Sequence, residues 1–399
     1  MGEKVEVSKK DFRTTIDGSA ETAVTYIDDG TGIEPEDIEG EGQITEPFDP
    51  TLIRVETRQM SLDTLIARIR EGELDLAPSF QRKGGIWKDE AQSRLIESVL
   101  IRIPLPAFYM DATDEDRWLV VDGLQRLTTL RRFVIDQDLK LKGLEFLKLQ
   151  GKTFDELPRS FQRRINETQV TVCLIEKGSP PEVKFNIFKR INTGGAPLSP
   201  QEIRHVLNQG KVTPFLERLA NSEEFKRATD NGIRDDRMAD RECVLRFLAF
   251  MIVPYTSYKA HDFDSFLSER MAEMNEFSDQ KLEQLAWQFL RVMRAGSDIF
   301  GPDAFRKRYR RDAGRHPINK ALFEAWSINL SRLDDEKIQF LAKHKEIVQE
   351  YFIKLMNEDR TFENSISLST GGLKSIEYRF QAIEKLIAEV LHDSHIASL

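Results

Sequence analysis

The sequence predicts an α+β protein, in which a compact α/β domain is followed by a longer and mainly helical region. Two observations lead to this prediction. Over roughly residues 52–176, short apolar runs of strand character alternate with segments whose apolar residues recur at helical spacing. From residue 181 onward only the helical spacing continues. At 399 residues the chain is long enough for each region to bury its own core.

The N-terminal stretch differs from both regions. Between Ile27 and Pro50 there are nine acidic residues and no basic one, so the segment cannot bury enough apolar surface to fold alone. We therefore expect residues 1–50 to form a disordered acidic arm, which is either a solubilising tail or a mobile segment that competes with DNA for a basic surface. Residues 51–180 then form the α/β domain and residues 181–399 the helical domain.

Local patterns place the elements of the α/β domain in order. The segment LIRVET is a predicted strand, and Ser61 caps a helix that Gly72 ends. The strands AFYM, RWLVVD and VTVCLIE follow later in the chain. The residues expected to face inward are Leu62, Leu65, Ile66 and Ile69 in the first helix, Leu95, Ile96, Val99 and Leu100 in the second, and Leu127, Leu130, Phe133 and Val134 in the third.

Composition limits the classes of function. No apolar run approaches the roughly 20 residues of a membrane-spanning helix, and the charged N-terminus is unlike a secretory signal, so we expect a cytoplasmic protein without membrane contact. Cys173 and Cys243 lie in apolar segments without metal-site spacing, which predicts buried free thiols and no metal site. A net charge of −9 restricts any contact with DNA to a local basic patch.

The segment RWLVVDGLQRLTTLRRF places a strand, then Asp122-Gly123, then a helix with Gln125 and Arg126 in its first turn. Such a turn directs unpaired N–H groups and the positive end of a helix dipole at one spot, which suits phosphate. Gly123 permits close approach, Arg126 offers a guanidinium fork, and Asp122 could orient a nucleophilic or magnesium-bound water. The structural alternative is that Asp122 is only an N-cap and Arg126 only an exposed helix residue.

Three motifs in the same order strengthen the functional interpretation. The stretches DLAPSFQRKGGIWKDEAQSRLIESVLIRIPLPAFYM, VVDGLQRLTTLRRF and FNIFKRINTGGAPLSPQEIR together resemble the GmrS-type N-terminal domain of GmrSD restriction systems. That family belongs to the ParB/sulfiredoxin-like superfamily, and the resemblance implies this fold for the α/β domain. It also implies nucleotide binding and hydrolysis in defence against phage carrying modified DNA.

The family's usual pentapeptide is Asp-Gly-Gln-Gln-Arg, and this chain has Leu124 in place of the first Gln. If that Gln contacts nucleotide, the substitution puts hydrolysis in doubt; if it faces the core, Leu124 is harmless. Sulfiredoxin relatives carry Cys at this place, so thiol repair chemistry is not expected. The resemblance implies Asp122, Gln125 and Arg126 as catalytic residues, and Gly123 and Thr128 as nucleotide-binding residues.

Two further loops are expected to border the same pocket. Gln81 and Arg82 correspond to the family's Gln-Arg pair, and RINTGG would supply backbone donors unless it is only a helix C-cap. The nucleotide-binding residues expected from these loops are Gln81, Arg82, Arg190, Asn192, Gly194 and Gly195.

A basic cluster in FRKRYRRDAGR is the candidate DNA-binding patch. Its members are Arg306, Lys307, Arg308, Arg310 and Arg311. The alternative is the solvated face of a helix.

The leading hypothesis is an NTP-binding and hydrolysing subunit, with Mg²⁺ as companion of a nucleotide of unknown base, that couples nucleotide state to DNA engagement. The chain shows no His-Asn-His nuclease motif, so a separate nuclease or effector protein is an expected partner, and a homo-oligomer stays open. The alternative is a ParB-like DNA-binding regulator or NTP sensor that does not hydrolyse.

Overall fold

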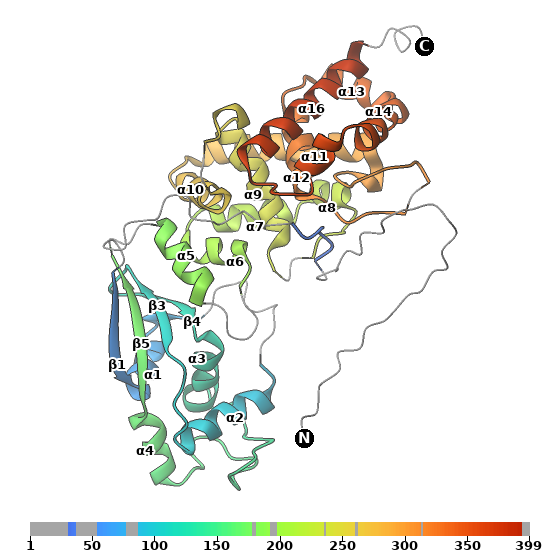
Figure 1. The fold of residues 1–399 in the computed structure, drawn as a ribbon. Coiled ribbons are helices and arrows are strands. Elements are labelled where there is room, and N and C mark those ends of the chain that lie inside the picture. Colours follow the sequence, from blue (N-terminus) through green and yellow to red (C-terminus); the bar gives the residue numbers. More distant parts are fainter. Residues whose placement is uncertain are drawn as a thin grey trace.

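The architecture comes from a computed structural model, shown in Figure 1. The structure describes residues 31–36, 54–76, 87–177, 181–191, 198–234, 237–259, 262–312 and 314–392. A sheet with its covering helices lies at one end of the molecule, and a large group of helices forms the other end (Figure 1). The predicted α+β class is therefore confirmed.

The sheet has five strands in the order β1-β5-β3-β4-β2. Antiparallel pairs join β1 to β5 and β3 to β4, whereas β3 pairs with β5 and β2 with β4 in parallel. The strands are β1 (Val55–Ser61), β2 (Leu74–Asp75), β3 (Phe108–Ala112), β4 (Trp118–Asp122) and β5 (Gln169–Glu176). Apolar and β-branched residues recur along these segments, as a half-buried pleated sheet requires.

One face of the sheet is covered by the helices of the α/β part. These are α1 (Leu62–Arg70), α2 (Asp89–Leu100), α3 (Leu124–Leu130) with a π-helical turn directly after it (Arg131–Ile135), and α4 (Arg159–Glu167). All twelve residues that the periodicity predicted to face inward are buried. Ser61 caps α1 by accepting from the Thr64 N–H, and Gly72 adopts φ +78° just beyond its end, as predicted.

The other face of the sheet carries a second, smaller core. Val121 and Ile175 point to this side because side chains alternate along a strand. They pack against Phe185 of α5 and Ile203 of α6, so these two helices join the sheet to the rest of the chain. A capping box begins α6, since Ser199 accepts from the Glu202 N–H and Glu202 accepts from the Ser199 N–H.

The remaining helices enclose the largest core. α9 lies at its centre, because residues 239–250 of this helix are all buried. Cys173 and Cys243 are buried free thiols, as predicted. The helical part comprises α5 (Pro181–Ile191), α6 (Pro200–Leu207), α7 (Val212–Ala220), α8 (Glu223–Thr229), α9 (Ala239–Ile252), α10 (Phe263–Asn275), α11 (Asp279–Phe300), α12 (Lys320–Ser331), α13 (Asp335–Lys343), α14 (Lys345–Glu358), α15 (Arg360–Ser365) and α16 (Leu373–His392), with 3-10 turns at Tyr255–Ser257 and Gly301–Asp303.

The acidic arm departs from its prediction over Thr31–Glu36. This segment is docked against the helical part: Ile33 enters the large core, and Glu34 pairs with Lys307 at 2.6 Å. The expectation of a wholly disordered arm is therefore wrong for these six residues, because their partners lie far along the chain. In the described parts of the chain, no helix is both long enough and apolar enough to cross a membrane.

Candidate functional site

The predicted phosphate turn joins the end of β4 directly to α3. Gly123 is the N-cap of α3 with φ +102°, and no side chain of the described residues caps the helix. A Cβ at this position would lie 2.4 Å from a ring carbon of Phe108, so both the backbone angle and the close approach require glycine. The alternative that Asp122 is the N-cap is wrong, since that residue ends the strand.

Arg126 fixes this turn to the neighbouring chain. Its guanidinium donates to the carbonyl oxygens of Pro106 and Ala107 and to Asp122 Oδ2, the last at 2.7 Å, and it lies 4.4 Å above the ring of Phe108. The side chain is buried, and burial lowers the pKa of Arg126 despite the opposing effect of Asp122. The alternative of an exposed Arg126 is therefore wrong, and much of its donor capacity is already directed at the protein.

Gln125 connects the turn to the start of α2. Its Oε1 accepts from the Trp87 N–H at 3.2 Å, while Gln92 Nε2 donates to the Trp87 carbonyl at 3.0 Å. Arg132 in turn donates to Gln92 Oε1 at 2.7 Å. Trp87 itself is 37% exposed. Side-chain amides thus hold Trp87 beside the first turn of α3.

Leu124 faces the core of the α/β part. It is 9% exposed and belongs to the apolar cluster formed by the sheet and its helices. Of the two alternatives for this position, the structure supports the core-facing one. The substitution of Leu for the family's Gln therefore changes packing beneath the turn, rather than the groups on its surface.

The other predicted nucleotide-binding residues are distributed as follows. Thr128 is half-buried one turn further along α3, and Arg190 is exposed near the end of α5. Gln81, Arg82, Asn192, Gly194 and Gly195 lie outside the described residues. The structure thus brings together Asp122, Gly123, Gln125 and Arg126.

A polar cluster that the sequence did not reveal lies at the end of β3. Lys184 of α5 donates to Asp111 Oδ2 at 3.0 Å and also to the hydroxyl of Thr113. The side chains of Lys184 and Asp111 are 12% and 10% exposed, and the pair fastens α5 to the sheet. The sequence shows only that a charged residue stands at the end of an apolar strand. It does not show which residue pairs with it.

The candidate DNA-binding patch needs two corrections. Arg306 is buried and donates to the carbonyl oxygens of Pro302, His316 and Thr229, and Lys307 is buried against Glu34. Neither side chain is available to DNA in this structure.

The rest of the patch is more exposed. Arg308 pairs with Asp303, whereas the side chains of Arg310 and Arg311 are 67% and 58% exposed. The stretch is a loop between α11 and α12, so the helix-face alternative is also wrong.

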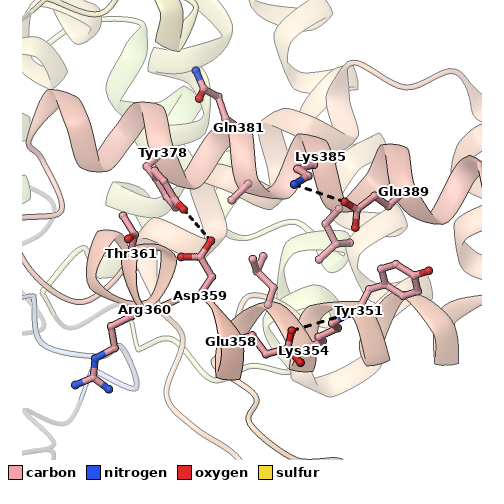
Figure 2. A pocket seen from close by; sticks show the side chains of 13 residues that line it. Tyr351, Lys354, Glu358, Asp359, Arg360, Thr361, Tyr378, Gln381, Lys385 and Glu389 are labelled. Atoms are coloured by element: carbon pink, nitrogen blue, oxygen red, sulfur yellow. Dashed lines mark hydrogen bonds and ion pairs between the residues drawn. The ribbon is translucent and has the colours of Figure 1, made fainter.

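A pocket of about 730 Å³ lies elsewhere, between α14, α15 and α16 (Figure 2). Several of its polar wall residues pair with one another, as in Lys385–Glu389 at 3.8 Å and the Tyr378 hydroxyl that donates to Asp359 at 2.8 Å. It includes none of the predicted site residues. Within the described residues, no three His, Cys, Asp or Glu side chains are arranged to hold a metal ion.

The comparison with known families bears on the β4–α3 turn. Residues 62–207 match the family model described as the GmrSD restriction endonuclease, N-terminal domain. These residues form a GmrSD-type N-terminal domain. The match begins at the first residue of α1, ends at the last residue of α6 and contains the turn. No curated protein matches the chain.

The GmrSD-type domain associates the chain with restriction, the defence against phage, in which DNA is the target. The domain includes α5 and α6, which pack on the second face of the sheet. The remaining helices, from α7 to α16, lie outside the match.

Proposed function

We propose that the chain is the nucleotide-responsive subunit of a GmrSD-type restriction system and that the β4–α3 turn binds the phosphates of a nucleoside triphosphate. The observation that supports this proposal is Gly123, which takes φ +102°, has no side chain of its own to cap the helix and leads straight into it. The first backbone bond within the helix runs from the Leu127 N–H to the Gly123 carbonyl, so the N–H groups before it have no backbone partner within the helix and can bind a ligand.

The surrounding side chains suggest separate roles. Arg126 is a positioning residue that holds Asp122 and the turn, because its guanidinium donates to the protein. The Asp122 side chain is 28% exposed, which leaves it able to orient a water or a magnesium-bound water. Gln125 holds Trp87 at the edge of the turn, where the ring would border the nucleotide.

The test is a panel of ATP, GTP, CTP and UTP with Mg²⁺, in which binding and phosphate release are measured separately. We expect Asp122→Asn to bind the accepted nucleotide within about threefold of wild type and to release phosphate at least tenfold more slowly, because the shape of the side chain is kept while its charge is lost. Arg131→Ala is the matched control, since its side chain is on the same helical run and 49% exposed. If wild type binds none of the four nucleotides, the proposal fails.

A second candidate is a sensor that binds nucleotide without hydrolysing it. It is favoured by the buried contacts of Arg126, which leave the turn without a fully available guanidinium to offset charge in a transition state. Tight binding of one nucleotide with no phosphate release, with and without DNA, would favour the sensor. Release that DNA stimulates would favour hydrolysis.

A further inference from the structure

The docked part of the N-terminal arm, Thr31–Glu36, pairs with the helical part through its main chain. We call this segment the clasp. The Glu34 N–H donates to the Ile318 carbonyl at 2.8 Å, and the Ile318 N–H donates to the Gly32 carbonyl at 3.2 Å. The clasp thereby forms a short parallel bridge beside the start of α12 (Figure 1). Pairing of this kind is how many proteins bind an extended peptide.

Two positions of the clasp restrict its sequence through backbone angle, close contact and burial. Gly32 has φ +78°, and a Cβ there would lie 1.7 Å from the carbonyl oxygen of Gly232, so no other residue fits. Ile33 is 4% exposed and packs in the large core. The clasp is therefore recognised by shape as well as by charge.

Glu34 is bound by two buried side chains. Lys307 Nζ donates to Oε1 at 2.6 Å, and Asn319 Nδ2 donates to Oε2 at 3.1 Å. Lys307 also donates to the Ser367 hydroxyl at 2.7 Å. Among the described residues, Glu34 is the only carboxylate that forms an ion pair with Lys307.

Glu36 is held by a bidentate contact with Arg246. The two guanidinium nitrogens donate to its two oxygens at 2.8 and 2.6 Å. The Thr370 hydroxyl donates at 2.9 Å and Lys320 at 3.3 Å. Burial would raise the pKa of Glu36, but Arg246 and Lys320 outweigh this effect and lower the pKa to about 2. The carboxylate is therefore charged throughout the ordinary pH range.

The clasp also balances the charge of the helical part. Arg246 and Lys320 share Glu242, and Arg246 also contacts Glu324 at 2.8 Å. Arg246, Lys320 and Arg379 pair with these two carboxylates of the helical part, whereas among the described residues Lys307 pairs only with Glu34 of the clasp. Arg204 also approaches Glu242, but its shorter contact is to Asp264 at 2.6 Å. Without the clasp, Lys307 would lose its ion-pair partner among the described residues, and Arg246 and Lys320 would lose the carboxylate of Glu36.

We propose that the helical part carries a binding site for an acidic peptide of the form Gly-Ile-Glu-x-Glu, and that the clasp is its ligand within the same chain. We call the residues that bind it, Arg246, Lys307, Ile318, Asn319, Lys320 and Thr370, the clasp site. A nucleic acid could supply the two anions, but it could supply neither the main-chain pairing with Ile318 nor the Ile33 side chain. The observations therefore favour a peptide over phosphate.

The site has a mechanical consequence. The clasp precedes β1 in the sequence, whereas the clasp site belongs to helices that follow the GmrSD-type domain. The clasp therefore holds the segment before the GmrSD-type domain against the helices that follow this domain. Its release would leave the domain joined to helices α7 to α16 by the chain that follows α6 and by contacts of α5 and α6, such as the ion pair of Arg204 with Asp264 of α10.

The test uses the full chain and a fluorescent synthetic peptide of residues 29–38. In wild type the tethered clasp acts at an effective concentration in the millimolar range and excludes the peptide. Gly32→Ala expels the clasp without altering the clasp site, so we expect it to bind the peptide at least tenfold more tightly than wild type. Gly40→Ala, the same change in the same arm, should behave as wild type. Equal binding by all three chains would overturn the proposal.

Two further measurements identify what the site recognises. Lys307→Met in the Gly32→Ala background should abolish peptide binding, as should Gln at both Glu positions of the peptide. A single-stranded oligonucleotide should not displace the peptide; displacement would show a phosphate site and overturn the proposal. If circular dichroism shows that Gly32→Ala is unfolded, Glu34→Gln with Glu36→Gln replaces it, with Glu39→Gln and Glu41→Gln as the matched control.

Discussion

The β4–α3 turn and the clasp site both bury arginine, but they compensate its charge in different ways. At the turn, Arg126 is balanced by Asp122, only four residues away, and by nearby carbonyl groups. At the clasp site, Arg246 has one partner nearby in the sequence, Glu242, but its bidentate contact is with Glu36, which lies 210 residues earlier in the chain. The first arrangement is local and serves a turn, whereas the second joins distant parts of the molecule. The residues beside an arginine in the sequence therefore do not reveal whether its charge is available to a ligand.

The largest effect should come from removing the arginine with distant partners. Arg246→Met leaves Glu36, Glu242 and Glu324 without their shared cation. We expect the free energy of unfolding to fall by about 3–5 kcal/mol, measured by urea denaturation. Lys385→Met is the control, since that side chain is 79% exposed and should contribute less than about 1 kcal/mol. Similar losses of unfolding free energy for the two variants would show that the buried Arg246 contributes no more to stability than an exposed ion pair.

His205 differs from the two buried arginines, because it is a buried basic side chain that the fold keeps neutral. Burial, helped by Arg241, lowers its pKa from 6.5 to about 4. The folded state therefore binds this proton less tightly than the unfolded state. Its contribution to stability is complete above pH 6.5 and is lost as the pH falls through 4.

From pH 7 to pH 4, wild type should lose about 3 kcal/mol more of its unfolding free energy than His205→Gln. The measurement is urea denaturation of both chains at several pH values. Parallel pH dependences for the two proteins would show that His205 is not kept neutral by the fold.

Leu124→Gln tests the turn region, where the expected loss is smaller. The substitution restores the family's usual residue but places an amide in an apolar core, at a position 9% exposed. We expect the free energy of unfolding to fall by about 2 kcal/mol, with nucleotide affinity unchanged. Leu124→Met should cost less than about 1.5 kcal/mol. A Gln variant with faster phosphate release and no loss of stability would show that position 124 reaches the nucleotide.

Much of the α/β part was predictable because its signals are local. The helical spacing of Leu62, Leu65, Ile66 and Ile69 identified the buried face of α1, and Ser61 identified its start. Each rule needs only the residues of one element and its cap. The alternation of strands and helices then indicated the fold class, without giving the order of strands in the sheet.

The unpredicted features depend on contacts between distant residues. Glu34 and Lys307 are separated by 273 positions, so a composition that predicts a disordered arm gives no sign of their contact. Arg306 lies in a basic run typical of a solvated surface, yet its buried carbonyl partners include Thr229, 77 positions away. At the candidate site, the sequence identified Gly123 as part of the turn. It did not show that the Arg126 guanidinium would donate to the carbonyl oxygens of the two residues before β3.

The smallest effect on stability is expected at the exposed end of the basic loop. Arg310 and Arg311 form exposed ion pairs at 3.8 and 3.1 Å, and Arg311 also donates to the Glu346 carbonyl at the surface, so their joint replacement by Ala should change the unfolding free energy by less than about 1 kcal/mol. If this loop contacts DNA, the same change should lower the slope of log affinity against log salt by about 2 for a 20-base-pair duplex. Arg360→Ala with Lys385→Ala removes equal charge elsewhere and should leave the slope unchanged. An equal decrease in both double variants would mean that net charge, rather than this loop, determines DNA binding.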